Sequence, residues 1–331
     1  MSSIDIIIPC YRYGRFLGQC VSSVLTQGIE DLRVLIIDDA SPDDTAEVGR
    51  GLEKSDSRVN FIRHAANKGH IATYNEGIEW TESTYYLLLS ADDYLTPGAL
   101  LRATHLMNEH PEVGFVFGAA MELNDDGTTS EVDLPAEMHG SAAEKILGGQ
   151  EFIRLSGASN PVRTPTAIVR TALQKRMGGY RPELPHSGDM EMWLRLASQV
   201  SIGAIRACQA VYRRHSNNMS LGYTNLSDLE QRKAALGYFF ESCHSSIRNF
   251  DVVRREILRA LAREAVQTAS GAFNAGQAEL CEKLTTFALC TSEDVKRSRP
   301  YFALRFKHIL GAKLSNRLRG AISPMLGKRA I

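Results

Sequence analysis

Tyr85-Tyr86-Leu87-Leu88-Leu89-Ser90-Ala91-Asp92-Asp93 is a short apolar run that ends abruptly in two carboxylates. Two earlier runs have the same form: residues 4–8 stop at Pro9-Cys10-Tyr11, and residues 34–37 stop at Asp38-Asp39-Ala40-Ser41. Continuous apolar runs of this length, separated by segments with helical spacing, are typical of parallel strands that are buried on both faces. The sequence therefore predicts an α/β fold built on a Rossmann-like sheet.

The alternation of strands and helices continues beyond these runs. Further strands are predicted at residues 59–63, 113–121 and 167–169, and one more ends at residues 212–215. Within residues 128–165 we expect a loop, a helix near residues 142–155 and then a Ser/Asn/Pro-rich stretch. Beyond residue 225 the apolar spacing is helical. The pattern divides the chain into an α/β domain over residues 1–222 and a helical appendage over residues 223–331.

The polar ends of the strands predict a ligand site. In open α/β sheets, ligands bind beyond the carboxyl ends of the strands. Carboxylates that meet there are costly to hold together without a cation between them. Asp92 and Asp93 are therefore candidate ligands for Mn²⁺ or Mg²⁺ on a nucleotide diphosphate. The alternative is that they form a turn and cap the helix that Pro97 opens.

Other candidate residues have similar pairs of interpretations. Asp39 either accepts hydrogen bonds from a base or ribose, or caps the next helix. Tyr11 either stacks on a nucleobase or packs in its loop. Asp189 is either a general base or the N-cap of the helix over residues 189–197. His215 is either a metal ligand or phosphate contact, or a satisfied structural histidine.

Composition sets wider limits on the class of protein. The 331 residues are 44% apolar and 23% charged, which is ordinary for a soluble globular protein. The six cysteines form no C-x-x-C pair and no zinc-ligand spacing. Neither a signal peptide nor an apolar stretch of the ~20 residues that span a bilayer is visible. A reduced cytoplasmic protein is expected.

Charge is unevenly distributed along the chain. Residues 295–331 contain ten Lys and Arg and no Asp or Glu, which leaves 28 bases and 38 acids in residues 1–294. Helical spacing of apolar side chains continues through this basic tail, at Phe306, Ile309, Leu310, Leu314, Leu318 and Ile322. A basic amphipathic helix of this kind either lies on the anionic inner face of a membrane or docks on the acidic body or a second subunit, as a homo-oligomer. Nucleic acid is not expected as a partner.

Over residues 4–220 the chain resembles the inverting family-2 glycosyltransferases of the GT-A fold. Ordered motifs support the resemblance: Ile6-Ile7-Ile8-Pro9-Cys10-Tyr11, Ile36-Ile37-Asp38-Asp39-Ala40-Ser41, Asn67-Lys68-Gly69 with Asn75 and Gly77, Leu88-Leu89-Ser90-Ala91-Asp92-Asp93, Gly178-Gly179-Tyr180, Asp189 with Leu194-Arg195-Leu196, and Tyr212-Arg213-Arg214-His215 with Asn218 and Ser220. The resemblance implies a GT-A mixed sheet flanked by helices as the catalytic domain.

The resemblance also implies roles at the nucleotide end of the site. Pro9 and Tyr11 would border the nucleobase, Asp39 would hydrogen-bond to it, and Asn67 belongs to a motif of the same site. The first position of the D-x-D motif is Ser90 here, where the family's carboxylate mainly contacts ribose. A hydroxyl at that position still donates or accepts a hydrogen bond.

At the reacting end, the resemblance implies that Asp92 binds the metal and that Asp93 supports it. His215 would lie near the metal and diphosphate, with Arg213 a weaker candidate there. Asp189 would be the catalytic base, although Gly188 stands where many relatives have an acid.

The expected activity is metal-dependent, inverting transfer of a sugar from a nucleotide-diphosphate sugar to an acceptor hydroxyl. The acceptor would be a saccharide or a lipid-linked molecule, in the synthesis of a polysaccharide, glycolipid or other glycoconjugate. A nicotinamide dehydrogenase is excluded because no G-x-G-x-x-G follows the first strand. A sugar-nucleotide pyrophosphorylase is set aside because Pro9-Cys10-Tyr11-Arg12-Tyr13-Gly14 is not a Gly-rich basic loop. A catalytically inactive nucleotide-sugar binder or assembly protein remains the alternative.

Overall fold

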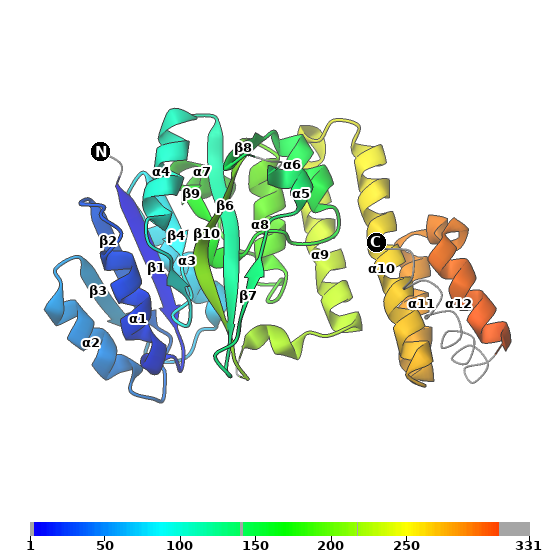
Figure 1. Ribbon diagram of the computed structural model, residues 1–331, viewed down its shortest axis with the longest axis horizontal. Helices are drawn as coiled ribbons and strands as arrows, with labels where there is room; N and C mark the ends of the chain where they lie inside the picture. The colour runs from blue at the N-terminus through cyan, green and yellow to red at the C-terminus, as the bar shows by residue number, and fades with distance from the viewer. Residues whose placement is uncertain (1–2, 140–141, 217, 311–331) are drawn as a thin grey trace, which may run out of the picture.

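The computed structural model describes residues 3–139, 142–216 and 218–310. A central mixed sheet is flanked by helices, and the last helices follow one another away from it (Figure 1). The strands are β1 (Ile4–Cys10), β2 (Leu32–Asp38), β3 (Val59–Arg63), β4 (Tyr85–Leu88), β5 (Tyr94–Leu95), β6 (Val113–Asn124), β7 (Thr129–Val132), β8 (Glu144–Leu147), β9 (Ile168–Arg170) and β10 (Ser201–Arg214). The helices are α1 (Gly14–Leu25), α2 (Thr45–Ser55), α3 (His70–Trp80), α4 (Ala99–Glu109), α5 (Ala136–His139), α6 (Gly149–Ser156), α7 (Thr171–Met177), α8 (Gly188–Ala197), α9 (Leu226–Cys243), α10 (Phe250–Asn274), α11 (Ala278–Thr291) and α12 (Arg299–Leu310).

Eight strands of the sheet follow the order β3-β2-β1-β4-β9-β6-β10-β5, with β7 on β6 and β8 on β10. The pairs β1–β2, β2–β3, β1–β4 and β6–β10 are parallel. Strand β9 lies antiparallel between β4 and β6, which makes the sheet mixed. The predicted α/β sheet flanked by helices, followed in the chain by C-terminal helices, is confirmed.

Burial of β1 on both faces explains its continuous apolar sequence. Successive side chains of a strand point to opposite faces. Ile6 and Ile8 accordingly join a core with α1 and α4, whereas Ile7 joins the core on the other face with α3 and α8. All three isoleucines are fully buried. The carboxyl end of β1 is therefore fixed between two packed layers.

Close packing of α3 on β1 depends on Gly77. A Cβ atom at Gly77 would lie 2.2 Å from Cγ2 of Ile7, which has no room to move. We expect Gly77→Ala to lower the free energy of unfolding by about 2 kcal/mol, because the added methyl overpacks the core. Gly51→Ala in α2 is the matched control, since nothing lies within 4 Å of its added Cβ. Urea denaturation should show the control equal to or above the wild type, and an unchanged midpoint for Gly77→Ala would contradict the packing argument.

The prediction of one helix near residues 142–155 is wrong in its first part. Glu144–Leu147 forms β8, which pairs antiparallel with residues 202–205 of β10. The helix α6 begins only at Gly149, where an added Cβ would lie 1.8 Å from the carbonyl oxygen of Ala197. Unpaired backbone at the sheet edge gives residues 144–147 hydrogen-bond partners that a local helical pattern does not reveal.

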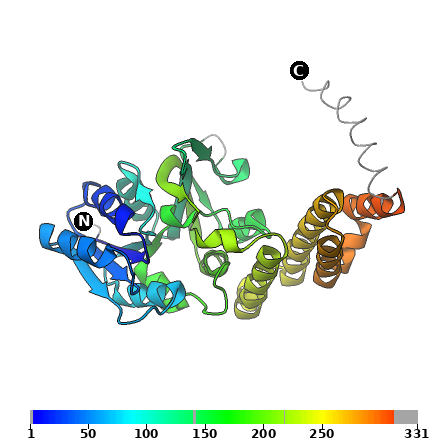
Figure 2. The ribbon, with the colours of Figure 1, turned by 90° about the horizontal axis from the view of Figure 1, so that it is seen from below.

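The C-terminal helices extend the hydrophobic core that lies on one face of the sheet. Leu229 of α9, Leu261 of α10 and Leu284 of α11 belong to the same buried cluster as Phe115 of β6. Figure 2 shows α10, α11 and α12 extending to one side of the sheet. The helical character predicted beyond residue 225 is confirmed through residue 310, and the division at residue 222 stays a prediction.

Candidate active site

A tight turn after β4 presents Asp92 and Asp93. The main-chain N–H of Asp93 donates to the carbonyl oxygen of Ser90 at 3.0 Å, which closes the turn. Strand β5 follows at once and pairs antiparallel with β10, so that Tyr94 lies opposite Val211. Both carboxylates are buried, at 5% and 2% exposed. Holding two acids there is costly in free energy, as the sequence indicated.

The end of β10 supplies partners to these two acids. The main-chain N–H of Arg213 donates to Oδ1 of Asp93 at 3.0 Å. Nε2 of His215 lies 3.1 Å from Oδ2 of Asp92. The side chain of Asn218 donates to the same Asp92 oxygen at 3.4 Å, and its Oδ1 accepts from the main chain of His215. The imidazole of His215 is further held by stacking on Phe16 of α1.

Asp93 and Asp92 differ in their surroundings. Burial, with the negative charge of Asp92 next to it, raises the pKa of Asp93 well above its usual range. Asp93 is held by the main chain of Arg213, whereas Asp92 contacts the side chains of His215 and Asn218. Asp92 is thus better placed than Asp93 to exchange its present contacts for a cation.

The donor set fits a divalent cation that is shared with a phosphate. Among the described residues, no group of three or more His, Cys, Asp or Glu side chains is arranged to hold a metal ion. Asp92 and His215 supply one carboxylate and one imidazole. Mg²⁺ and ions like it are commonly held by one or two protein ligands together with substrate phosphates and water. The arrangement therefore fits a metal–diphosphate complex better than an ion bound to the protein alone.

Asp39 organises the turn that enters α3. Its Oδ1 accepts from the main-chain N–H of Lys68 at 2.7 Å, and its Oδ2 accepts from that of Gly69 at 2.9 Å. Asn67 donates to the main-chain carbonyl of Asp39 at 3.1 Å. Asp39 is 4% exposed, and its carboxylate links the end of β2 to the turn before α3. Its contact with a nucleobase stays a prediction.

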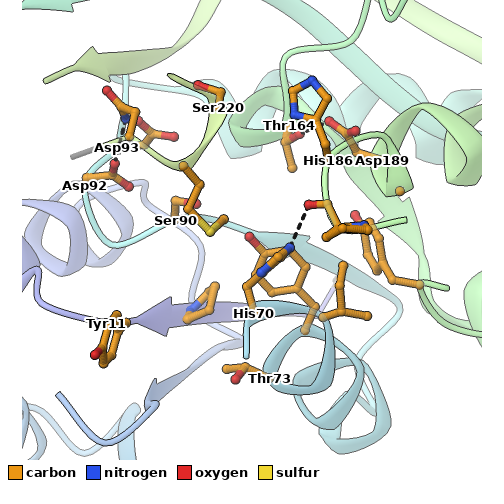
Figure 3. A pocket seen from close by; sticks show the side chains of 18 of the residues that line it. Tyr11, His70, Thr73, Ser90, Asp92, Asp93, Thr164, His186, Asp189 and Ser220 are labelled. Atoms are coloured by element: carbon orange, nitrogen blue, oxygen red, sulfur yellow. Dashed lines mark hydrogen bonds between the residues drawn. The ribbon is translucent and has the colours of Figure 1, made fainter. Parts of the chain in front are cut away.

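A single cavity of about 1230 Å³ is lined by most of the predicted residues, namely Pro9, Tyr11, Asp39, Asn67, Ser90, Asp92, Asp93 and Asp189. Figure 3 shows Ser90, Asp92 and Asp93 on one side of it, Asp189 with Thr164 and His186 on another, and Tyr11 apart from both groups. Tyr11 is 43% exposed, which leaves its ring accessible. Residues that are far apart in the sequence therefore line one cavity.

Two predicted residues do not line the cavity. His215 lies behind Asp92, in contact with it. The guanidinium of Arg213 packs over the rings of Phe16 and Tyr94, 4.8 and 5.0 Å from their centroids. Arg213 therefore acts through its main chain on Asp93 in this structure, and its assignment to the diphosphate stays a prediction.

Asp189 lies in the first turn of α8, facing the cavity from the other side. Its Oδ2 accepts hydrogen bonds from the Asn160 side chain at 3.0 Å and from the Thr164 hydroxyl at 3.1 Å. Burial raises the pKa of Asp189 above its usual range, against the lowering effect of hydrogen bonds from the main chain of Met190 and the Thr164 hydroxyl. A carboxylate with a raised pKa and a fixed orientation is suited to accept a proton.

The loop that leads to Asp189 is tied to α3 by Asn75. Its side chain accepts from the main-chain N–H of Tyr180 at 2.7 Å and donates to the carbonyl of the same residue at 2.9 Å. His70 reaches the carbonyl of Pro185 at 2.9 Å in the same loop, the contact drawn in Figure 3. Contacts from α3 therefore hold the loop that forms this wall of the cavity.

Sequence reasoning did not select Asn160 and Thr164 as site residues. They belong to the Ser/Asn/Pro-rich stretch that precedes β9, and only the polar composition of that stretch was a signal. Because β9 runs antiparallel to β4 and β6, the segment before it lies at the edge of the sheet where those two strands end. Asn218 was noted within a motif but was given no role of its own.

The family model for glycosyl transferase family 2 matches residues 5–169, which run from within β1 to within β9 and include the turn with Asp92. The chain belongs to glycosyl transferase family 2. This confirms the resemblance seen in the sequence.

Curated relatives share parts of this chain. The uncharacterized glycosyltransferase EpsJ of Bacillus subtilis is 32% identical over 101 residues, which is 30% of this chain and 29% of that protein. An uncharacterized glycosyltransferase of Haemophilus influenzae is 20% identical and covers 67% of this chain and 68% of its own length. The GalNAc(5)-diNAcBac-PP-undecaprenol beta-1,3-glucosyltransferase of Campylobacter jejuni is 27% identical, covering 44% of this chain and 45% of its own. The chain thus aligns with less than two thirds of EpsJ and of the Campylobacter enzyme.

Solved structures extend the likeness to the C-terminal helices. The crystal structure of S. aureus TarS 1–349 superposes with a TM-score of 0.62 and 14% identity, covering 92% of this chain and 91% of that one. At this identity the likeness shows the fold alone. Among the described residues, no helix combines the length and apolar character that crossing a membrane requires.

Proposed function

We propose that the chain transfers a sugar from a nucleotide-diphosphate sugar to an acceptor hydroxyl, with inversion at the anomeric carbon. The supporting observation is one cavity that has two buried acids of the β4 turn on one side and the Asp189 carboxylate on another. The two acids of the β4 turn suit a cation-bound diphosphate, and the Asp189 carboxylate suits the removal of a proton from an acceptor hydroxyl. TarS, which shares the fold, has been crystallised with UDP and with UDP-GlcNAc.

In the proposed reaction Asp189 accepts the proton of the acceptor hydroxyl while its oxygen forms a bond to the anomeric carbon. The bond from that carbon to the diphosphate breaks, and its electron pair leaves with the nucleoside diphosphate. The sugar passes through an oxocarbenium-like state, as in glycoside hydrolysis. A single displacement of this kind inverts the configuration.

Asp92 and His215 would hold a Mn²⁺ or Mg²⁺ ion, whose chemistry is to neutralise the charge of the diphosphate. Asn160 and Thr164 orient the Asp189 carboxylate, as their hydrogen bonds to Oδ2 indicate. Pro9, Tyr11, Asp39 and Asn67 would surround the nucleoside. Ser90 would contact the ribose through its hydroxyl.

The acceptor is proposed to be a saccharide, free or lipid-linked, in glycoconjugate synthesis. The Campylobacter relative carries in its name a glycan on a diphosphate-linked polyprenol, which supports this class. The far part of the cavity is lined by His186 and Tyr223, whose rings stack at 4.2 Å, and by Asp228. An aromatic wall beside carboxylates suits a polyhydroxyl ligand.

Incubation of the full chain with UDP-, GDP- and dTDP-sugars and Mn²⁺ tests the proposal. We expect release of nucleoside diphosphate from one of them, which chelation of the metal abolishes. NMR of the product with a simple acceptor should show the anomeric configuration inverted. Donor binding without any release of diphosphate, in all metals and acceptors tried, would instead support the inactive binding protein.

A further inference from the structure

The last described helix, α12, has apolar side chains on two opposite faces. Leu304 is 1% exposed and belongs to the core that includes α10 and α11. Phe302, Phe306 and Ile309 are 62%, 59% and 78% exposed. Residues spaced by four and three positions fall on one side of a helix, so these three form a single outward stripe. We call Phe302, Phe306 and Ile309 the outer stripe.

The inner face of α12 is already anchored to the protein. Nζ of Lys307 donates to Oγ of Ser270 at 2.6 Å and to Oδ1 of Asn274 at 3.0 Å, both on α10. The ring of His308 lies 4.7 Å from that of Phe273. Docking on the body therefore uses the face opposite to the outer stripe. Phe306 and Ile309, which the sequence assigned to the apolar face of the tail, lie outside this contact, and docking of the remaining tail stays a prediction.

The outer stripe differs from the other exposed apolar residues of the described chain. Elsewhere the large exposed apolar side chains are single residues of separate elements, such as Ile62, Leu101 and Val252, apart from Met219 and Leu221, which share the one-turn segment Met219–Gly222 beside the cavity. Single exposed apolar residues are normal on soluble proteins. Three large ones on successive turns of a helix indicate a surface that binds something.

The charge of the same segment identifies the partner's chemistry. Arg299 and Arg305 of α12 are exposed, and residues 295–331 contain ten bases and no acid. A two-fold contact between two copies of the outer stripe would bring these bases against one another. An anionic lipid surface instead offers headgroup phosphates to the bases and an apolar boundary to the stripe.

We propose that α12 binds the surface of anionic lipid bilayers, with Phe302, Phe306 and Ile309 at the boundary between headgroups and acyl chains and Arg299 and Arg305 on the phosphates. This inference is independent of the proposed catalytic function, because no residue of α12 lines the cavity. Residues 311–331, where Leu314, Leu318 and Ile322 continue the predicted amphipathic spacing, lie outside the described residues.

Sedimentation of the full chain with vesicles tests the proposal. We expect binding to phosphatidylcholine vesicles that contain phosphatidylglycerol to exceed binding to pure phosphatidylcholine by about tenfold or more, and to fall with added salt. The triple variant Phe302→Ser/Phe306→Ser/Ile309→Ser should lose about tenfold in partition to the anionic vesicles. Arg299→Glu/Arg305→Glu should lose binding to anionic vesicles while leaving weak binding to neutral ones unchanged.

Leu101→Ser/Val252→Ser is the matched control, since it removes exposed apolar side chains of α4 and α10. This control should bind vesicles as the wild type does. Circular dichroism melts should agree for all variants, because the replaced side chains are mostly exposed. Vesicle binding that is equal in the wild type and the triple variant would overturn the proposal. A second result would also overturn it: neither protein binds vesicles, and sedimentation velocity shows an oligomer for the wild type and a monomer for the triple variant. The partner of the outer stripe would then be a second copy of the chain.

Discussion

Replacing Asp189 with Asn is expected to reduce glycosyl transfer by about 10³-fold or more while leaving the affinity for the nucleotide donor unchanged. General-base catalysis contributes roughly 10²–10⁴-fold, and an amide cannot accept the proton. The side-chain oxygen of Asn still accepts the hydrogen bonds of Asn160 and Thr164, so the local geometry is retained. Release of nucleoside diphosphate measures turnover, and calorimetric titration measures donor binding. Near-normal turnover would remove Asp189 from the base role.

The pH profile gives this prediction a second readout. Burial raises the pKa of Asp189, and the carboxylate accepts a proton only when it is ionised. Transfer by the wild type should therefore fall as the pH decreases through the raised pKa. The residual transfer of Asp189→Asn should lack this acidic limb, and a limb that persists in the variant would assign it to another group.

Stability separates loss of chemistry from loss of folding. A carboxyl whose pKa is raised in the folded state binds its proton more tightly there, so its contribution to stability is present at low pH and is lost as the pH rises through the folded-state pKa. At neutral pH the ionised Asp189 thus opposes folding, and Asp189→Asn should melt at or above the wild-type temperature. Asp125→Asn, in the exposed turn after β6, is the matched control and should change neither activity nor melting. A lower melting temperature for Asp189→Asn would contradict the assigned cost of burial.

Replacing Asp92 with Ala is expected to abolish the metal-dependent part of donor binding and, with it, transfer. Asp92 is the acid of the β4 turn whose contacts are side chains, His215 and Asn218. Loss of residues that merely support a metal ligand costs roughly 10–100-fold in metal affinity, so loss of the ligand itself should cost more than about 100-fold. Calorimetric titration of UDP in the presence of Mn²⁺ measures the effect.

The same titrations test how the metal is held. Because the proposed site has two protein ligands, Asp92 and His215, Mn²⁺ alone should bind weakly to the wild type, and it should bind more tightly once UDP is present. UDP without metal should bind the wild type and Asp92→Ala equally. Asp125→Ala serves as the control carboxylate. An unchanged titration of Asp92→Ala with Mn²⁺ and UDP would exclude Asp92 as the ligand.

Much of the fold and part of the site could be predicted because they depend on local pattern. Strands buried on both faces need continuous apolar residues, and residues 4–8, 34–37 and 85–89 have them. The carboxyl ends of parallel neighbours meet at one edge of the sheet, so the strand pattern predicts Pro9 and Asp92 at the same edge, and β1 and β4 are indeed parallel neighbours. Asp39 was assigned to the correct edge, but its hydrogen bonds to the turn before α3 join residues that are 29 and 30 positions apart in the sequence.

The sequence by itself determined the α/β alternation, the acids at the strand ends and the family to which they belong. Tertiary structure alone decided that Asn160 and Thr164 reach Asp189 and that His215 reaches Asp92. The first contact depends on β9 running antiparallel, and the second on the two-residue β5 pairing with β10. The physical reason is that side chains alternate between the two faces of a strand in the same way whichever direction the neighbouring strands run. The period of the sequence therefore encodes which side chains are buried, but not which strand lies alongside or in which direction that strand runs.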